Sequence, residues 1–218
     1  MSHSEKIVAV IPAYNEAKTI NAVVRGLLPH VTEVVVIDDC SKDATSEEAH
    51  TAGATVIRHE HNQGYDQTLN DGFTEAVRRG ADIIITFDAD GEHDANDVPR
   101  IVAPILAGRA DMVAGQRPRI LHIAEKIFAV YTAARYGLKD PLCGLKAYRR
   151  SVYDSIGFFD SVSSIGTELM LRGVKKGYRL ALVPIALHTR VGNSSRFYAQ
   201  SVRANLKILR AMQRILFI

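Results

Sequence analysis

Short runs of apolar and β-branched residues alternate with helical segments in the first half of the chain. The apolar runs are residues 6–11, 33–38, 54–58 and 82–87, and the segments with helical periodicity are about 16–28, 43–52, 66–79 and 97–107. In the first helical segment, apolar residues recur at the spacing of one helix face: Ile20, Val23, Val24 and Leu27. This alternation predicts an α/β fold, a mostly parallel central sheet flanked by helices on both faces.

The pattern changes after residues 111–117. We expect a helix at 121–136, an irregular segment at 139–150, a helix near 165–176, extended pieces around 179–191 and a helix from about 195 to the end. No repeat or low-complexity linker separates these parts. The chain therefore reads as one domain, 1–218, made of a first half (1–117), a second part (118–194) and a C-terminal helix (195–218).

Polar residues gather where the predicted strands stop. Pro12 to Glu16 follow the first strand, Asp38 and Asp39 the second, and Asp88 to Glu92 the fourth. In open α/β sheets, ligands bind outside the carboxyl ends of the strands. The three stretches are therefore expected to meet in one crevice.

Four acids crowd the stretch "FDADGEHD" at residues 87–94. Like charges this close repel unless a cation, a proton or a turn separates them. Carboxylates with few nitrogen or sulfur ligands nearby suit Mg²⁺ or Mn²⁺, which commonly bind through one or two carboxylates plus substrate phosphates. The alternative is an acidic turn that caps the helix beginning near Asn96 or Asp97.

Composition narrows the class of protein. The chain has 218 residues, 47% of them hydrophobic and 23% charged, which fits one globular domain. Two cysteines, Cys40 and Cys143, are too few for a disulfide framework and indicate a reducing cytoplasm. We expect no signal peptide, and no apolar run approaches the roughly 20 residues that span a bilayer.

Charge is distributed unevenly. No Asp or Glu follows Glu168, whereas the last 50 residues contain ten Lys and Arg residues. Such a block suits nucleic acid, an acidic membrane surface or a phosphorylated substrate, and a solvated basic face is the alternative. The scarcity of aromatic residues among these cations argues against nucleic acid.

Several enzyme classes are excluded because the chain lacks the motifs that they require. The chain contains no G-x-x-x-x-G-K-[ST] phosphate loop, no G-x-G-x-x-G after the first strand and no G-x-S-x-G elbow. Its eight histidines show no zinc spacing, and we expect most of them at the surface or in turns.

A set of motifs in fixed order resembles family 2 glycosyltransferases, especially the dolichol-phosphate mannose synthase or polyprenyl-phosphate type. The set comprises "PAYNE" (12–16), "VVVIDDCSKDAT" (34–45), "FDADGEHD" (87–94), "AGQR" (114–117), "DPLCGLKAYRR" (140–150) and "RVGNSSR" (190–196). The resemblance covers nearly the whole chain. It implies a GT-A fold, a nucleotide-sugar donor (UDP or GDP), a divalent metal, Mg²⁺ or Mn²⁺, and inversion at the anomeric carbon.

The resemblance also implies roles for individual residues. Base and ribose would be lined by Pro12, Ala13, Tyr14 and Glu16, with Asp39 or Asp38 beside the base. Donor and metal would face the D-x-D pair, Asp88 and Asp90, with Asp90 the more direct metal ligand. Arg190 and Arg196 occupy the family's basic segment that closes over the donor phosphates; for each, a solvated loop is the alternative.

Two positions depart from the family pattern. Glu92 stands where the mannose-synthase type has Gln as a further metal ligand, so the implied metal ligands here are Asp90, Glu92 and Asp88. Asp66 stands where glycine is common, as a specificity change or as loop variation.

The acceptor is inferred from an absent base. Relatives that glycosylate a sugar hydroxyl carry a Glu-Asp motif, whereas Glu168 is followed here by Leu169. An anionic phosphate needs no base, which favours polyprenyl phosphate, gripped by Arg117 and Arg119 with Arg135 as a third candidate. The expected catalytic set is thus Asp88, Asp90, Arg117 and Arg190.

Two other functions stay open. One is transfer to a saccharide hydroxyl in polysaccharide or glycolipid assembly, with Glu168 as base; the other is a noncatalytic nucleotide-sugar-binding protein. The first half (1–117) would bind the nucleotide sugar and residues 118–194 the acceptor.

The C-terminal helix is basic and amphipathic. Arg203, Lys207, Arg210 and Arg214 are spaced to align along one face of the helix, beside several Leu and Ile residues. Such a helix can lie in the membrane interface, which would place the protein in the cytoplasm, peripheral at the inner face of the cell membrane. Packing of this helix against the domain or in a homo-oligomer is the alternative.

Overall fold

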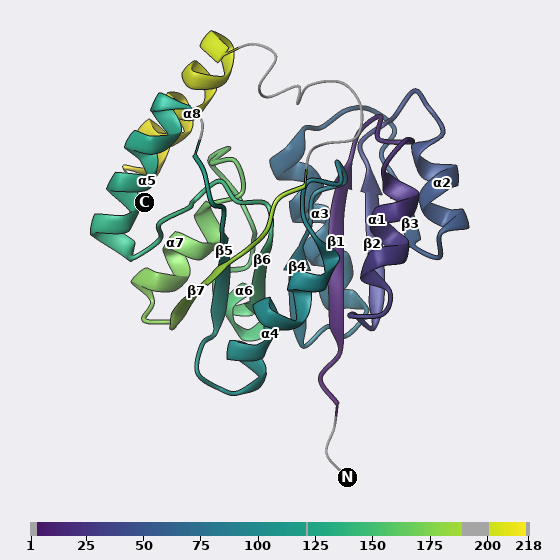
Figure 1. The fold of residues 1–218 in the computed structure, drawn as a ribbon, viewed down its shortest axis with the longest axis horizontal. Coiled ribbons are helices and arrows are strands. Elements are labelled where there is room, and N and C mark those ends of the chain that lie inside the picture. Colours follow the sequence, from purple (N-terminus) through teal and green to yellow (C-terminus); the bar gives the residue numbers. More distant parts are fainter. Residues whose placement is uncertain (1–3, 121, 189–200, 217–218) are drawn as a thin grey trace.

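A seven-stranded sheet runs through the middle of the molecule (Figure 1). The computed structural model describes residues 4–120, 122–188 and 201–216. The strands are β1 (Ile7–Ala13), β2 (Glu33–Asp38), β3 (Thr55–Arg58), β4 (Ile83–Thr86), β5 (Met112–Gln116), β6 (Lys146–Arg149) and β7 (Leu180–Pro184). Their order is β3-β2-β1-β4-β6-β5-β7, and all neighbours are parallel except those of β6.

Helices cover both faces of this sheet. In chain order they are α1 (Ile20–Leu27), α2 (Thr45–Thr51), α3 (Tyr65–Arg78), η1 (Ala95–Asp97), α4 (Val98–Leu106), α5 (Ile123–Tyr136), α6 (Arg150–Ile156), α7 (Glu168–Lys175) and α8 (Ser201–Ile215). Residues of α1, α2 and α4 share one buried cluster, and residues of α3, α5, α6, α7 and α8 share the other. The α/β architecture expected from the alternation is confirmed.

The alternation of side chains along each strand explains the two clusters. In β1, Ala9 and Ile11 join the cluster of α1 and α4, whereas Val8 and Val10 join that of α3. All four are fully buried, which is why the strand reads as a continuous apolar run. Helix α3 approaches β1 closely because residue 72 is glycine; a Cβ there would lie 2.2 Å from Cγ1 of Val10.

The second half contains two elements that the sequence pattern did not predict. Strand β6 lies within the segment expected to be irregular and pairs antiparallel with both β4 and β5, and α6 follows it directly. A strand of four residues, "KAYR", is too short to show an alternation, and its pairing partners are far apart in the sequence. Strand β5 was not predicted as a strand either, whereas the other helices and strands with an expected position lie close to it.

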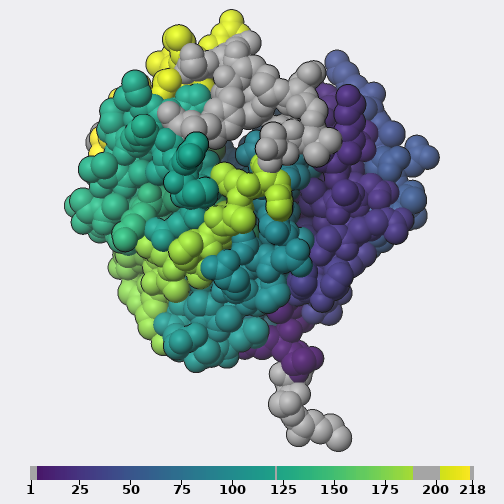
Figure 2. All heavy atoms as spheres, viewed as in Figure 1, coloured from purple at the N-terminus to yellow at the C-terminus, as the bar shows by residue number. Residues whose placement is uncertain are grey.

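Helix α8 packs beside α5 at one edge of the molecule (Figures 1 and 2). Ala204, Ile208, Ala211 and Ile215 are buried, and the side chain of Asn205 accepts a hydrogen bond from the backbone N–H of Ala124 at 3.0 Å. The expected start at residue 195 lies outside the described residues. In the described part of the chain, we find no helix with both the length and the apolar character needed to cross a bilayer.

Candidate active site

A cavity of about 480 Å³ opens at the carboxyl ends of β1, β4 and β5. These strands end together because β5 and β4 both run antiparallel to β6 and so run the same way. Four residues expected to hold base and ribose line one wall: Pro12, Ala13, Tyr14 and Glu16. The loops after the strands thus meet in one crevice, as the sequence predicts.

The structure distinguishes the two neighbouring aspartates after β2. Asp39 lines the cavity, and its carboxylate accepts hydrogen bonds from the backbone N–H groups of Gln63 (2.7 Å) and Gly64 (2.8 Å). Asp38 is fully buried and does not line it; its carboxylate binds the backbone N–H of Ser41 at 2.8 Å and the hydroxyl of Ser46. Asp39 is therefore the aspartate placed to meet a ligand.

The four acids of the 87–94 stretch have different surroundings. Asp88, Asp90 and Glu92 line the cavity, and Oδ1 of Asp90 accepts a hydrogen bond from the backbone N–H of Glu92 at 3.0 Å. Asp94 caps η1 by accepting from the backbone N–H of Asn96 at 2.9 Å. Asp94 therefore has the helix-capping role, whereas the other three acids line the cavity, and their role as a ligand site stays a prediction.

Asp88 is fixed from two sides. The hydroxyl of Tyr65 donates to its Oδ1 at 3.3 Å, and Nε2 of the buried His93 lies 3.4 Å from its Oδ2. Burial opposes ionisation of Asp88, but the hydrogen bonds from His93 and Tyr65 and the charge of His93 outweigh it and lower the pKa of this carboxyl. Asp88 is thus held as a carboxylate in a defined orientation.

A buried lysine lies beneath this site. Lys146, the first residue of β6, donates through Nζ to the backbone carbonyls of Pro141 (2.8 Å) and Gly166 (2.7 Å). Burial lowers its pKa to about 8, against the opposing charges of neighbours that include Asp140 and Asp88. Lys146 therefore ties together two loops at the cavity and places a cation near Asp88.

The carboxylates fit a hard cation as a partial ligand set. The residues that the structure describes contain no cluster of three or more His, Cys, Asp or Glu side chains arranged to hold a metal. Mg²⁺ is commonly held by one or two carboxylates, with phosphate oxygens and water completing its shell. The oxygen donors of Asp90, Glu92 and Asp88 are of the right type for such an ion.

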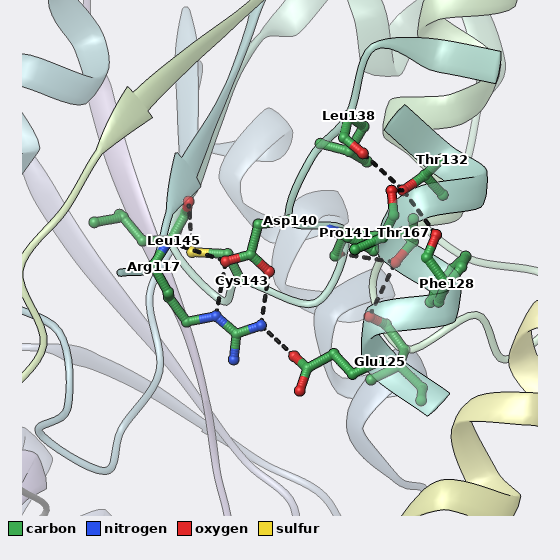
Figure 3. A network of polar contacts seen from close by, with 12 residues as sticks. Arg117, Glu125, Phe128, Thr132, Leu138, Asp140, Pro141, Cys143, Leu145 and Thr167 are labelled. Atoms are coloured by element: carbon green, nitrogen blue, oxygen red, sulfur yellow. Dashed lines mark hydrogen bonds and ion pairs between the residues drawn. The ribbon is translucent and has the colours of Figure 1, made fainter. Parts of the chain in front are cut away.

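Arg117 lies in the cavity wall within a network of carboxylates (Figure 3). Its Nε and Nη2 donate to Asp140 at 2.8 and 2.6 Å, and Nη2 also contacts Glu125. Burial opposes the charge of Arg117, but the hydrogen bonds and charge of Asp140 and the charge of Glu125 raise the pKa of the guanidinium. The guanidinium of Arg117 is thus already bound by two carboxylates.

The other candidate arginines do not join Arg117. Arg119 and Arg135 are exposed and do not line the cavity. Arg135 lies near the end of α5, ten residues beyond Glu125, or about 15 Å along the helix, and stacks on Tyr136 at 5.8 Å. Arg190 and Arg196 lie outside the described residues.

Glu168, the candidate base, is fully buried and does not line the cavity. Its carboxylate accepts hydrogen bonds from the backbone N–H of Ser161 at 2.5 Å and from Nε of Arg172 at 2.6 Å. These contacts hold the 160–167 loop against α7 and leave Glu168 no access to a substrate hydroxyl.

The motif order and this geometry agree with the match to a family model. Residues 8–160 match the model described as Glycosyl transferase family 2. The chain belongs to that family. The enzyme class expected from the motif set is thereby confirmed.

Relatives of this family 2 glycosyltransferase include proteins that are named for lipid phosphates. The chain is 30% identical over 175 residues to UDP-N-acetylglucosamine–dolichyl-phosphate N-acetylglucosaminyltransferase of Methanococcus voltae, covering 66% of this chain and 70% of that protein. It is 28% identical over 203 residues to undecaprenyl-phosphate mannosyltransferase of Micrococcus luteus, covering 83% and 82%. An uncharacterized protein of Methanocaldococcus jannaschii is 33% identical over 198 residues, covering 84% and 82%.

Solved structures confirm the GT-A fold. Mannosyl-3-phosphoglycerate synthase from Rubrobacter xylanophilus aligns with a TM-score of 0.77 at 19% identity, over 98% of this chain and 74% of that one. Glucosyl-3-phosphoglycerate synthase from Mycobacterium tuberculosis in complex with Mn²⁺ and UDP-glucose aligns with a TM-score of 0.74 at 23% identity, over 96% and 79%. At these identities the likeness concerns the fold alone.

Several residues at the candidate site were not foreseen. His59 and His93 are buried beside Asp39 and Asp88, not at the surface as expected of most histidines. Glu125 and Lys207 line the cavity from α5 and α8. Only the place of His93, within the acidic stretch 87–94, was a signal in the sequence. The others reach the site through tertiary packing.

Proposed function

We propose that this enzyme is a metal-dependent, inverting glycosyltransferase that moves a sugar from a nucleoside diphosphate, UDP or GDP, to a polyprenyl phosphate. The observation that carries the choice of acceptor is the burial of Glu168. This residue stands where relatives that act on hydroxyls carry a Glu-Asp motif with an Asp general base, and its carboxylate is already hydrogen-bonded to the 160–167 loop and Arg172. The names of the relatives from Methanococcus voltae and Micrococcus luteus support the same acceptor class.

The chemistry requires no base for such an acceptor. An oxygen of the acceptor phosphate attacks the anomeric carbon from the side opposite the nucleotide, and the bond from that carbon to the donor diphosphate breaks. The bonding electrons leave with the nucleoside diphosphate, so negative charge grows on its terminal phosphate. Because the attacking oxygen is already anionic, no proton has to be removed.

Residues at different positions in the cavity have different proposed roles. Of the cavity-lining residues, we assign Pro12, Ala13, Tyr14, Glu16 and Asp39 to base and ribose, and Asp88 and Asp90 to the diphosphate and sugar. A Mg²⁺ or Mn²⁺ ion bound by Asp90, with Glu92 and Asp88 beside it, would offset the charge of the leaving diphosphate. Tyr65, His93 and Lys146 keep Asp88 ionised and oriented.

Contact with a membrane is part of this proposal, because a polyprenyl chain stays in the bilayer. Exposed apolar side chains lie on and beside the two neighbouring helices α5 and α8: Ile123, Ile127 and Val130 on α5, Val202, Leu206 and Leu209 on α8, and Leu216 directly after α8. We call these seven residues the α5–α8 apolar surface. α8 carries no acidic residue, so the surface adjoins cations that suit anionic lipid at the inner face of a cell membrane.

One observation favours a second candidate, transfer to a saccharide hydroxyl. Glu125 is buried, lines the cavity and has one carboxylate oxygen, Oε2, with no hydrogen-bond partner among the described residues. This carboxylate, and not Glu168, would then be the base. If so, Glu125→Gln abolishes the acidic limb of the pH–rate profile, whereas a phosphate acceptor leaves that limb in place.

The decisive experiment is a donor-by-acceptor activity matrix. UDP-N-acetylglucosamine, UDP-glucose and GDP-mannose are each offered with Mg²⁺ or Mn²⁺ to a short-chain polyprenyl phosphate, the matching polyprenol, 3-phosphoglycerate and a sugar alcohol. We expect turnover with polyprenyl phosphate, and none after chelation of the metal. Turnover with the sugar alcohol or polyprenol alone would refute the proposed acceptor, and binding of donor without any turnover would favour a noncatalytic protein.

A further inference from the structure

Asp39 and His59 lie side by side at the ends of two neighbouring strands. Strands β2 and β3 run parallel, and their register pairs Asp38 with Arg58, so the chain leaves both strands together at Asp39 and His59. Nδ1 of His59 lies 2.9 Å from Oδ1 of Asp39, and both residues are buried. Asp39 lines the cavity whereas His59 does not, so His59 can act on a ligand only through Asp39.

The partners of His59 determine which of its ring atoms carries a hydrogen toward Asp39. A carboxylate accepts hydrogen bonds and cannot donate them, so the hydrogen in this contact belongs to Nδ1 of the imidazole. On the other side of the ring, Nε2 lies 3.1 Å from Oδ2 of Asp71 on α3. Asp71 is held in turn by Gln67, whose amide donates to its Oδ1 at 3.0 Å. His59 is thus fixed between two carboxylates as a donor to Asp39.

The hydrogen bonds of Asp39 leave little room for a ligand. A carboxylate has about four positions at which it can accept a hydrogen bond, two on each oxygen. Among the described residues, Nδ1 of His59 and the backbone N–H of Gln63 occupy those on Oδ1, and the backbone N–H of Gly64 occupies one on Oδ2. A ligand in the cavity therefore has one acceptor position to bind, on Oδ2.

Uracil and guanine differ in the number of donors that they present to such a group. On its Watson–Crick edge, uracil has a single N–H, at N3, between two carbonyl oxygens, whereas guanine has two adjacent donors, N1–H and the exocyclic amine. Two adjacent donors pair best with both oxygens of a carboxylate at once. Because both positions on Oδ1 of Asp39 are occupied, guanine would keep one donor unpaired in the cavity, which lowers its affinity.

We propose that the donor site selects UDP over GDP, and that His59 sets this preference by occupying Oδ1 of Asp39. His59 is a positioning residue in this proposal, because it acts through Asp39 and does not contact the nucleotide. The inference rests on the proposed function, in which Asp39 is assigned to base and ribose. It narrows the two donor classes of that function to one.

Calorimetric titration of nucleoside diphosphates in the presence of Mn²⁺ tests the preference without turnover. We expect wild type to bind UDP roughly 10- to 100-fold more tightly than GDP, the effect of one unpaired donor. Inosine diphosphate lacks the exocyclic amine of GDP and presents N1–H alone. It should therefore bind wild type at least roughly fivefold more tightly than GDP, although the two purines have nearly the same size.

Substitutions of His59 test its part in the preference. His59→Leu removes the donor to Oδ1 and leaves that oxygen to guanine, so the advantages of UDP and of inosine diphosphate over GDP should both fall at least about fivefold. His59→Asn places an amide N–H close to the position of Nδ1 and should keep both ratios within about twofold of wild type. His61→Leu, at an exposed histidine two residues along the chain, is the matched control and should change neither ratio.

Ratios of affinities separate a positioning role from a purely structural one. If His59 only supported the fold, His59→Leu would weaken all three nucleotides equally, and that result would overturn its role. Equal binding of UDP and GDP to wild type, or equal binding of inosine diphosphate and GDP, would overturn the preference and its cause even if His59→Leu did not fold. Binding of none of the three, or affinities that Asp39→Asn leaves unchanged, would instead contradict the proposed function.

Discussion

The carboxylate of Asp88 lies directly against the backbone of Gly144. A Cβ at residue 144 would come within 1.8 Å of Oδ2 and 2.4 Å of Cγ of Asp88. Asp88 follows β4 and Gly144 precedes β6, so the antiparallel pairing of these strands produces the contact. The glycine thus leaves the space that the orientation of the Asp88 side chain in this structure requires.

Gly144→Ala should therefore displace Asp88 and lower turnover. We expect a loss of about 1–3 kcal/mol in the free energy of unfolding, as for other overpacked sites, measured by urea denaturation. The double variant Asp88→Ala/Gly144→Ala should recover most of this stability without recovering activity, because the shortened side chain removes the clash. Additive effects of the two changes on stability would contradict the contact.

Asp90→Asn tests the metal site. The change keeps the volume of the side chain but removes a charged oxygen ligand, so we expect turnover to fall roughly 100-fold or more and UDP binding to lose its dependence on Mn²⁺. Asp94→Asn, the same change four residues along the chain, should leave turnover nearly intact, since Asp94 caps η1. Near-normal turnover in a folded Asp90→Asn variant would refute the metal assignment.

Glu168→Gln should act on stability and not on proton transfer. The new amide nitrogen is a hydrogen-bond donor, and it would face a second donor, either the Ser161 backbone N–H or the Arg172 guanidinium. Because neither of these donors would then have an acceptor, we expect a loss of about 2–3 kcal/mol in the free energy of unfolding. The pH–rate profile of the remaining activity should keep its acidic limb. Loss of that limb together with turnover would restore Glu168 as a base.

The first half of the fold could be predicted because the patterns that indicate its strands and helices lie within short stretches of the sequence. Runs such as residues 83–87 show burial on both faces, and the stripe from Ile20 to Leu27 shows a helix face. Strand β6 could not be found in this way, because its pairing with β4 and β5 joins residues that are 32 to 66 positions apart along the chain. The same limit hid the contact between Gly144 and Asp88.

Those residues of the candidate site that come directly after a strand could be predicted from the sequence. Asp88, Asp90 and Tyr14 come directly after strands, so their convergence follows from the parallel order alone. Whether Arg117 is free to bind a ligand depends on Asp140 and Glu125, and Lys207 reaches the cavity only through the packing of α8 on α5. Charge and spacing in the sequence do not reveal which partners neutralise a given side chain.

Asp66 should make the stability of the fold depend on pH. Burial and the nearby Asp160 raise its pKa from 3.8 to about 6, while its Oδ1 accepts a hydrogen bond from the backbone N–H of Gly166. A raised carboxyl pKa means that the folded state holds the proton more tightly than the unfolded state. Stability from this group is therefore present below about pH 4 and is lost as the pH rises through 6.

Asp66→Asn keeps the acceptor oxygen and removes the charge. We expect the variant to be more stable than wild type by about 1–2 kcal/mol at pH 7.5, with the difference vanishing near pH 4, as measured by urea denaturation across this range. Asp154→Asn, at an exposed carboxylate on α6, is the control and should differ from wild type by less than about 0.5 kcal/mol at either pH. A constant difference between the Asp66 variant and wild type would exclude the titration.

The structure changes what is expected of membrane binding by α8. Of its four aligned cations, Lys207 lines the cavity and Arg214 donates to the backbone carbonyl of Val162 at 3.2 Å, so this face looks toward the site and the 160–167 loop. The outward face is apolar instead, with Val202 exposed to 80% and, on the neighbouring α5, Val130 to 71%. Apolar insertion should therefore contribute more to binding than the cations do.

We accordingly expect the triple variant Val130→Ser/Val202→Ser/Leu206→Ser to bind anionic liposomes at least roughly 100-fold more weakly in a sedimentation assay, since each side chain would lose about 1 kcal/mol or more on partial insertion. Arg203→Gln/Arg210→Gln should cost less, about 1 kcal/mol per charge, and only at low salt. Leu106→Ser is the matched control: Leu106 is 51% exposed at the end of α4, on the opposite face of the sheet, and its loss should change nothing. If the triple variant binds anionic liposomes as wild type does while the arginine variant does not, the contact is electrostatic. The α5–α8 apolar surface would then not be the membrane-binding surface.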